Sequence, residues 1–237
     1  MVSFVQQYTG PADTRYSYLV PPAGNLAHHG ETRPLGAVVL LARDAGITTP
    51  QLSRLAPGDG LLQLLCQNFA HDAPSELLVE RLLPLMEDTP CLLLHYSEPL
   101  AAVEAVQAAL REPSLLAVPC ARDEEPASAP SPRCMGDEPW MPGATVLEYS
   151  LEEELFLVEA SDGAIHRLNP SGRLVWQLLR QESLSAAELA ELLSEYYAQP
   201  LEEVLADVQE LLGRLANVGL VRSVATSGAA TVTLAQP

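Results

Sequence analysis

The chain contains no lysine, and all thirteen of its basic residues are arginines. This absence excludes mechanisms that need a lysine side chain, such as a Schiff base, a pyridoxal-phosphate anchor or a Walker-A phosphate clamp. Long apolar runs are also absent, because the longest uncharged apolar stretch, residues 35–42, is far shorter than the roughly 18 residues of a membrane span. The first ten residues lack the basic region and apolar core of a signal peptide, so no signal peptide is predicted there.

Basic residues are scarce relative to acidic ones, at 13 against 31, which gives a formal net charge of −18. Such a chain repels phosphate polyanions, so we predict no binding to nucleic acid or to anionic membranes. Hydrophobic residues make up 48% of the 237 residues, enough to bury a core. The four cysteines, Cys66, Cys91, Cys120 and Cys134, form no C-x-x-C pair, which predicts free thiols in a reducing cytoplasm and no zinc site.

A stretch rich in proline, serine and acidic residues, residues 120–140, divides the chain and is predicted to be a linker. Before it lies a segment, residues 1–119, with six arginines and twelve acidic residues, a net charge of −6. After it lies a compact segment, residues 141–222, with five arginines and fourteen acidic residues, a net charge of −9. Residues 223–237 are predicted to be a flexible tail.

The first segment alternates between predicted strands and predicted helices, which indicates an α/β or α+β arrangement. The strands are expected at residues 4–8, 16–20, 35–42 and 91–95, and the helices at 57–69, 75–86 and 99–110.

Four pieces of this segment, RPLGAVVLLAR, LSRLAPGDGLLQLL, LLPLMEDTPCLLLHYSEP and LAAVEAVQAAL, resemble the C-terminal portion of HPr-kinase-like proteins. The ATP site of that family is a glycine-rich loop that carries lysine and serine, and this sequence has no such loop. The resemblance therefore implies an N-terminal α/β kinase-like remnant that does not bind ATP by that route. A gene product that lacks its upstream part is the alternative explanation.

The second segment begins with three predicted strands, at residues 146–149, 154–159 and 164–168. Asp162-Gly163 is a strong hairpin-turn signal between the last two strands. Both faces of the middle strand are predicted to be apolar, because its successive side chains point to opposite faces. Leu155 and Leu157 lie on one face, and Phe156 and Val158 lie on the other. The acidic run 152–154 is predicted to be a solvated turn rather than a metal site.

Three helices are predicted to follow the strands, and each has a local signal at one of its ends. Asn169-Pro170 provides an N-cap and a first helical residue for a helix that ends near Arg180. Ser185 with Glu188 forms a capping box, and Gly219 ends a helix over residues 201–218. A three-stranded antiparallel sheet followed by three helices is a winged-helix-like domain, so the whole chain is predicted to be α+β.

This segment resembles the PqqD-like family of RiPP recognition elements, through DGAIHRLNPSGRLVWQLL, SLSAAELAELLSEYY, the spacer AQPLEEVLADV, and ELLGRLANVGLV. Members bind the leader of a ribosomally made peptide as an added strand and present it to modifying enzymes. The resemblance implies a non-catalytic peptide chaperone, with a precursor leader peptide and a modifying enzyme, such as a kinase, as partners. The residues expected to bind the peptide are Ala164, Ile165, His166, Arg167 and Leu168 on the third strand, and Val204, Asp207, Val208, Leu211 and Leu212 on the third helix.

Other residue patterns indicate structure rather than chemistry. Trp176 is predicted to be part of the core, because large aromatic side chains dominate core burial. The adjacent His28 and His29 point apart on a strand, which argues against metal binding. No nucleophile–base pair can be recognised in either segment, so no catalytic residues, metal or cofactor are expected. An acidic flank of the third helix, with Glu202, Glu203, Asp207 and Glu210, would suit a leader with basic residues.

Three classes of function therefore remain open. The first is the peptide-binding chaperone. The second is a peptide or protein kinase related to the HPr kinases, or the inactive partner subunit of one, and the absent lysine argues against catalysis. The third is a winged-helix DNA-binding regulator, which the −9 charge of the second segment disfavours.

Overall fold

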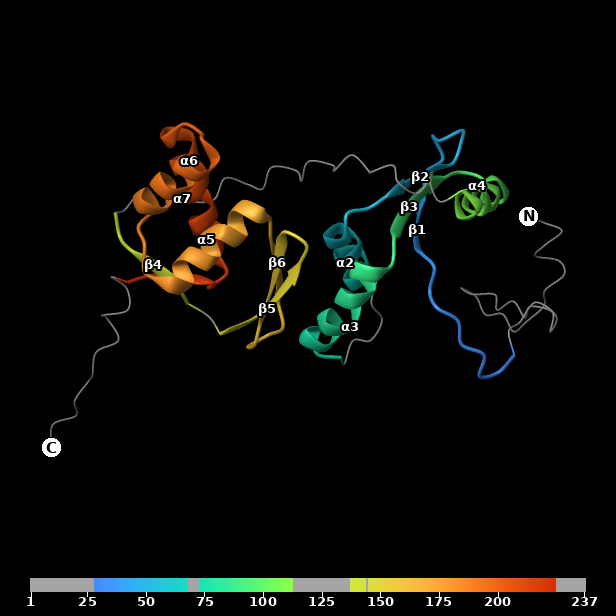
Figure 1. Cartoon of the computed structure of the whole chain (residues 1–237), viewed down its shortest axis with the longest axis horizontal. Helices are drawn as coiled ribbons and strands as arrows, with labels where there is room; N and C mark the ends of the chain where they lie inside the picture. The colour runs from blue at the N-terminus through green and yellow to red at the C-terminus, as the bar shows by residue number, and fades with distance from the viewer. Residues whose placement is uncertain (1–27, 68–72, 113–136, 144, 225–237) are drawn as a thin grey trace. The chain divides into compact units, whose positions relative to one another are not determined.

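The computed structural model describes residues 28–67, 73–112, 137–143 and 145–224 (Figure 1). The strands predicted at 4–8 and 16–20, most of the predicted linker and the end of the tail lie outside these residues. The described residues form two compact units, one from residues 28–63 and 84–112 and the other from residues 64–67, 73–83, 137–143 and 145–224. Both helices and sheets are present, so the chain is α+β.

The first unit is built on a three-stranded mixed sheet in the order β1-β3-β2. Strand β1 (Val38–Arg43) runs parallel to β3 (Cys91–Tyr96), and β2 (Gln51–Arg54) runs antiparallel to β3. The predicted strands at 35–42 and 91–95 are thereby confirmed with shifted bounds. Strand β2 was not predicted, because four residues with a half-polar sequence give no periodic signal.

Helices α2 (Pro57–Cys66) and α3 (Ser75–Asp88) follow β2 in the chain, and α4 (Pro99–Arg111) follows β3. The boundaries between the two units fall within α2 and α3, so most of α3 belongs to the second unit. Leu40, Leu92 and Leu94 are buried in this sheet. A Cβ atom at Gly60 of α2 would lie 2.9 Å from the Cβ and Sγ atoms of Cys91, so glycine permits the close approach of helix and strand. Burial raises the pKa of the Cys91 thiol, which keeps it protonated.

The second unit contains a three-stranded antiparallel meander, β5-β6-β7, as predicted. Its strands are β5 (Val146–Leu151), β6 (Glu154–Glu159) and β7 (Ile165–Leu168). Gly163 adopts a φ of +73° in the second turn, and the Asp162 carboxylate accepts a hydrogen bond of 2.9 Å from the Ala164 N–H. The Asp162-Gly163 turn is therefore confirmed, with only the glycine in the left-handed region.

Strand β6 is buried on both faces, in agreement with its two-sided apolar sequence. Leu155 and Leu157 belong to the main core cluster, which they share with the three helices that follow the meander. Phe156 and Val158 are fully buried on the opposite face of the sheet. The acidic run at the preceding turn does not behave as one solvated unit. Glu152 and Glu153 are exposed, whereas Glu154 is the first residue of β6 and only 8% exposed.

Three helices follow the meander: α5 (Pro170–Gln181), α6 (Ala186–Tyr197) and α7 (Leu201–Asn217). Asn169 caps α5, because its side-chain oxygen accepts from the Gly172 N–H at 2.9 Å. Ser185 and Glu188 form the predicted capping box of α6. Gly219, at φ +77°, follows the C-cap of α7, as expected for a C′ glycine.

A two-stranded sheet, β4 (Trp140–Pro142) with β8 (Val221–Ser223), completes this unit. Neither strand was predicted, and both correct a predicted boundary. Trp140, placed at the end of the linker by its sequence context, is only 9% exposed and belongs to the core cluster around Trp176. The ordered unit therefore begins before residue 141, and Ser223 belongs to β8 rather than to a tail.

Candidate functional site

Strand β7 is an edge of the three-stranded sheet. It pairs with β6, from Val158 with Ile165 to Leu155 with Leu168, and no other described strand pairs with its outer side. An edge strand presents unpaired N–H and C=O groups that can accept an added strand. Ala164, also predicted to bind a peptide, lies just before β7 and closes the hairpin.

The hydrogen-bond ladder shows which backbone groups of β7 are available. The Glu159 N–H donates to the Ala164 carbonyl at 2.9 Å, so Ala164 lies in a hydrogen-bonded pair with β6. Backbone groups alternate in direction along an antiparallel strand. The N–H and C=O groups of Ile165 and Arg167 are therefore directed away from β6, toward the open edge.

The side chains of β7 are held by acidic residues of β6. The Arg167 guanidinium donates from Nε and Nη2 to the two oxygens of Glu154, at 2.8 and 2.7 Å. His166 Nε2 lies 3.0 Å from Glu159 Oε1 on the other face of the sheet. These contacts fix both side chains against β6 and leave the outer backbone of β7 as its interaction surface.

A cavity of about 500 Å³ opens where α5, α6 and α7 meet, beside the residues that follow β7. Its apolar part includes Val175, Leu193 and Val208, which are 1–4% exposed and belong to the core cluster. We call this space the helix cavity. It is lined by Asn169, Ser171, Val175, Leu193, Tyr197, Gln199, Val204, Asp207, Val208, Glu210, Leu211 and Arg214.

Local structure explains why these residues converge. The Asn169 cap turns the chain from β7 directly into α5, and Gly172 permits the tight turn, since a Cβ there would lie 3.1 Å from the Asn169 Oδ1 atom. Ala198 adopts a left-handed conformation with φ +52° and ends α6. The Ser194 hydroxyl then donates to the Gln199 carbonyl at 2.6 Å, which holds the α6–α7 connection beside the cavity.

Four of the five predicted helix residues line the helix cavity: Val204, Asp207, Val208 and Leu211. Leu212 does not, because it is 0% exposed within the core, so its predicted place in a groove is corrected to a packing position. Val208 is itself only 3% exposed and serves both the core and the cavity wall. None of the β7 residues lines the cavity, which adjoins the strand only through Asn169 and Ser171.

Several cavity residues were missed by sequence reasoning, among them Tyr197 and Leu193 on α6. Tyr197 is 41% exposed and its ring lies 4.9 Å from that of Tyr196 in an edge-to-face pair. Two exposed tyrosines at the end of a helix are a signal that could have indicated a binding surface. Leu193 belongs to the apolar face of its helix, so its sequence context indicated the core alone.

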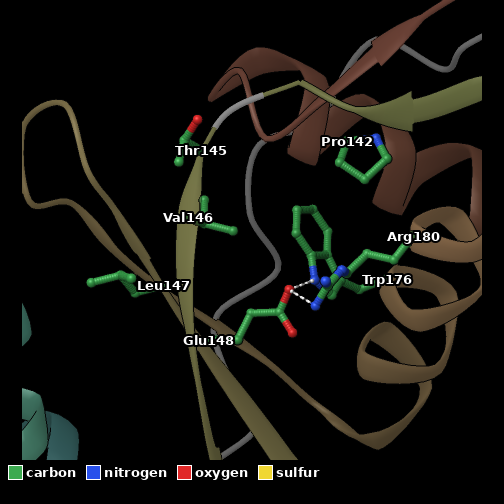
Figure 2. A pocket seen from close by; sticks show the side chains of 7 residues that line it. All are labelled: Pro142, Thr145, Val146, Leu147, Glu148, Trp176 and Arg180. Atoms are coloured by element: carbon green, nitrogen blue, oxygen red, sulfur yellow. Dashed lines mark hydrogen bonds and ion pairs between the residues drawn. The ribbon is translucent and has the colours of Figure 1, made fainter.

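A second cavity, of about 370 Å³, lies between β5 and α5. Figure 2 shows the Glu148 carboxylate reaching from β5 to Trp176 and Arg180 on α5. Glu148 Oε1 accepts from Trp176 Nε1 at 3.0 Å and from Arg180 at 2.6 Å. Trp176 is 1% exposed, which confirms its predicted core role. Because these polar groups satisfy one another, we regard the second cavity as structural.

The described residues bring together no group of three histidine, cysteine, aspartate or glutamate side chains that could hold a metal ion. Over the same part of the chain, no helix has the length and apolar character needed to cross a membrane.

The family model described as coenzyme PQQ synthesis protein D (PqqD) matches residues 154–221. The match runs from β6 to β8 and includes β7, the Asn169 cap and the whole helix cavity. A solved chain described as TbiB1 in complex with the TbiA(beta) leader peptide is 22% identical, over 35% of this chain and 94% of its own length, with a TM-score of 0.32. No curated protein matches the chain.

Proposed function

We propose that this protein is a non-catalytic chaperone that binds the leader of a ribosomally synthesised peptide and presents it to a modifying enzyme. The PqqD match over residues 154–221 supports this function, because it covers the segment whose resemblance to the PqqD-like family implies leader binding. The observation that carries the proposal is the open edge of β7, whose C-terminal end leads through Asn169 and Ser171 to the helix cavity. Strand addition uses such an edge for affinity and adjacent pockets for specificity.

In this mode the peptide pairs antiparallel with β7. The outward backbone groups of Ile165 and Arg167 hydrogen-bond to the peptide backbone. Because side chains alternate along a strand, the peptide residues opposite His166 and Leu168 face the helix side of the sheet. Val204 and Leu211, which are only partly buried, offer apolar surface to a side chain there.

The test begins with a random library of peptides about twelve residues long, long enough for a strand and one flanking turn. The library is selected on the full chain, and the enriched peptides are then titrated while backbone amide shifts are recorded. Shifts concentrated on β7 and α7 support the proposal. Shifts confined to α6 or to the first unit contradict strand addition, and failure to enrich any peptide contradicts peptide binding as such.

The acidic character of α7 disfavours the DNA-binding alternative. In a winged-helix regulator a helix enters the major groove and needs basic residues. Here α7 carries Glu202, Glu203, Asp207 and Glu210 against a single arginine, Arg214. A kinase function has no support from the described residues, since no glycine-rich lysine loop exists in the sequence.

The first unit is proposed to dock the modifying enzyme, a role that needs a surface but no ATP site. Helix α4 supports this idea, because Leu100, Val103 and Leu110 are 53–59% exposed and recur at helical spacing. Val103→Glu should then weaken the association with the modifying enzyme and leave peptide affinity unchanged. Unchanged association in this variant would count against a docking role for α4.

A further inference from the structure

The helix cavity combines an apolar wall with an acidic rim. Val175, Leu193 and Val208 form buried wall, and Asp207 and Glu210 line the cavity from the exposed side of α7. Within the described residues, Asp207 has no hydrogen-bond or ion-pair partner. Glu210 has one weak partner, Arg214, whose Nε atom lies 4.0 Å from the Glu210 carboxylate, and both side chains are about half exposed.

We propose that the helix cavity selects peptides that carry a lysine or arginine, with the charged head of that residue paired to Asp207. This inference rests on the proposed function. Lysine and arginine suit both parts of the cavity, because their methylene stems lie along apolar surface while their charged ends reach polar groups. An aspartate or glutamate at the same place meets a carboxylate instead, and like charges in contact disfavour binding.

The charge distribution around the cavity strengthens this selection. Glu202 and Glu203 lie in the first turn of α7, one to two turns before Asp207, so they add negative potential on the same helix. The whole chain carries a net charge of −18. Such a field draws cationic peptides toward the site and slows the approach of acidic ones.

The geometry also predicts where the cationic residue lies in the peptide. The cavity adjoins the C-terminal end of β7, at Asn169 and Ser171. In an antiparallel pair, the part of the peptide beside this end precedes the part beside Ile165. The cationic residue is therefore the one opposite Leu168, or one that precedes it, and it lies N-terminal to the residues that pair with Ile165 and Arg167.

The experiment compares the enriched library peptides on three forms of the full chain. Asp207→Asn removes the charge at the cavity and preserves the shape of the side chain. Glu191→Gln makes the same change in net charge on α6, at an exposed residue outside the cavity lining. Backbone amide shifts are recorded for each form of the chain. They show whether a peptide binds at β7 and α7, whatever its sequence.

We expect the enriched peptides to carry lysine or arginine at a fixed position, N-terminal to the residues that pair with β7. We expect Asp207→Asn to lower the affinity for these peptides about fivefold and Glu191→Gln to leave that affinity nearly unchanged. Replacing the peptide's cationic residue with norleucine should weaken binding to the wild-type chain and not to Asp207→Asn. Peptides that bind β7 and α7 without a cationic residue overturn this inference alone, whereas the absence of any groove-binding peptide overturns the proposed function as well.

Discussion

Arg167 and Glu154 form a two-point ion pair that ties the edge strand β7 to the start of β6. Their side chains are only 20% and 10% exposed, and both guanidinium contacts are shorter than 3 Å. The pair lies on the sheet face opposite α5, α6 and α7, so it fixes the edge strand without entering the proposed peptide path. An arginine predicted to bind peptide through its strand therefore also has a structural role.

The first prediction concerns this pair. Arg167→Met should lower the free energy of unfolding by about 2 kcal/mol, because the partly buried Glu154 carboxylate loses its guanidinium partner. Urea titration followed by circular dichroism measures the change. The double variant Glu154→Met with Arg167→Met should recover part of the loss, since both charges of the pair are then absent. A single variant as stable as the wild type would show that the pair contributes nothing.

The second prediction uses the alternation of backbone groups along β7. Ile165→Pro removes an N–H that faces the open edge, so it should weaken peptide binding at least about tenfold while the β6–β7 ladder survives. His166→Pro is the contrasting variant, because its N–H faces β6, and it should destabilise the fold itself. Calorimetry measures affinity and circular dichroism measures folding. Full affinity in a folded Ile165→Pro protein would contradict pairing along this edge.

The third prediction concerns the capping box of α6. Backbone and side-chain hydrogen bonds from Ser185 lower the pKa of Glu188. A carboxyl with a lowered pKa in the folded state stabilises the fold above its unfolded pKa, and this contribution is lost as the pH falls through the folded value. Ser185→Ala removes the hydroxyl contact and keeps the backbone N–H, so it should raise the Glu188 pKa only part of the way toward its ordinary value. The lost N-cap of α6 should by itself destabilise the protein by about 1 kcal/mol.

Carbon-detected NMR titration of the Glu188 carboxyl, together with unfolding curves at acidic and neutral pH, tests this prediction. Ser194→Ala serves as the comparison, because Ser194 lies on the same helix and makes no contact with Glu188. An unchanged Glu188 titration in Ser185→Ala would mean that the hydroxyl of Ser185 does not act on this carboxyl, since the backbone N–H of residue 185 donates to it in both forms.

The fourth prediction is that the protein does not bind ATP with measurable affinity. The sequence has no glycine-rich lysine loop, and backbone N–H groups together with a cation are what such a loop supplies to phosphates. Isothermal calorimetry with ATP and Mg²⁺ should therefore show no heat beyond dilution. Micromolar affinity would indicate a phosphate site of another kind and would support the alternative hypothesis of a kinase.

The sequence by itself determined the elements whose signals are local. Asn169-Pro170, the Ser185–Glu188 box, the Asp162-Gly163 turn and the apolar periodicity of α7 each act over a few residues. The parts of the site that depend on these signals, namely β7 and one flank of α7, were therefore predictable. The resemblance of the first segment to HPr-kinase-like proteins stays a prediction.

Only the tertiary structure decided which of these residues meet. Strands β2, β4 and β8 are short and are stabilised by pairing with strands distant in the sequence. The sequence therefore placed Trp140 in a linker, whereas its strand β4 pairs with β8 and Trp140 belongs to the core. Leu211 and Leu212 are adjacent and chemically identical, yet one lines the helix cavity and the other is fully buried. That difference follows from how α7 is rotated against α5 and α6, which packing sets and helical periodicity cannot resolve to a single residue.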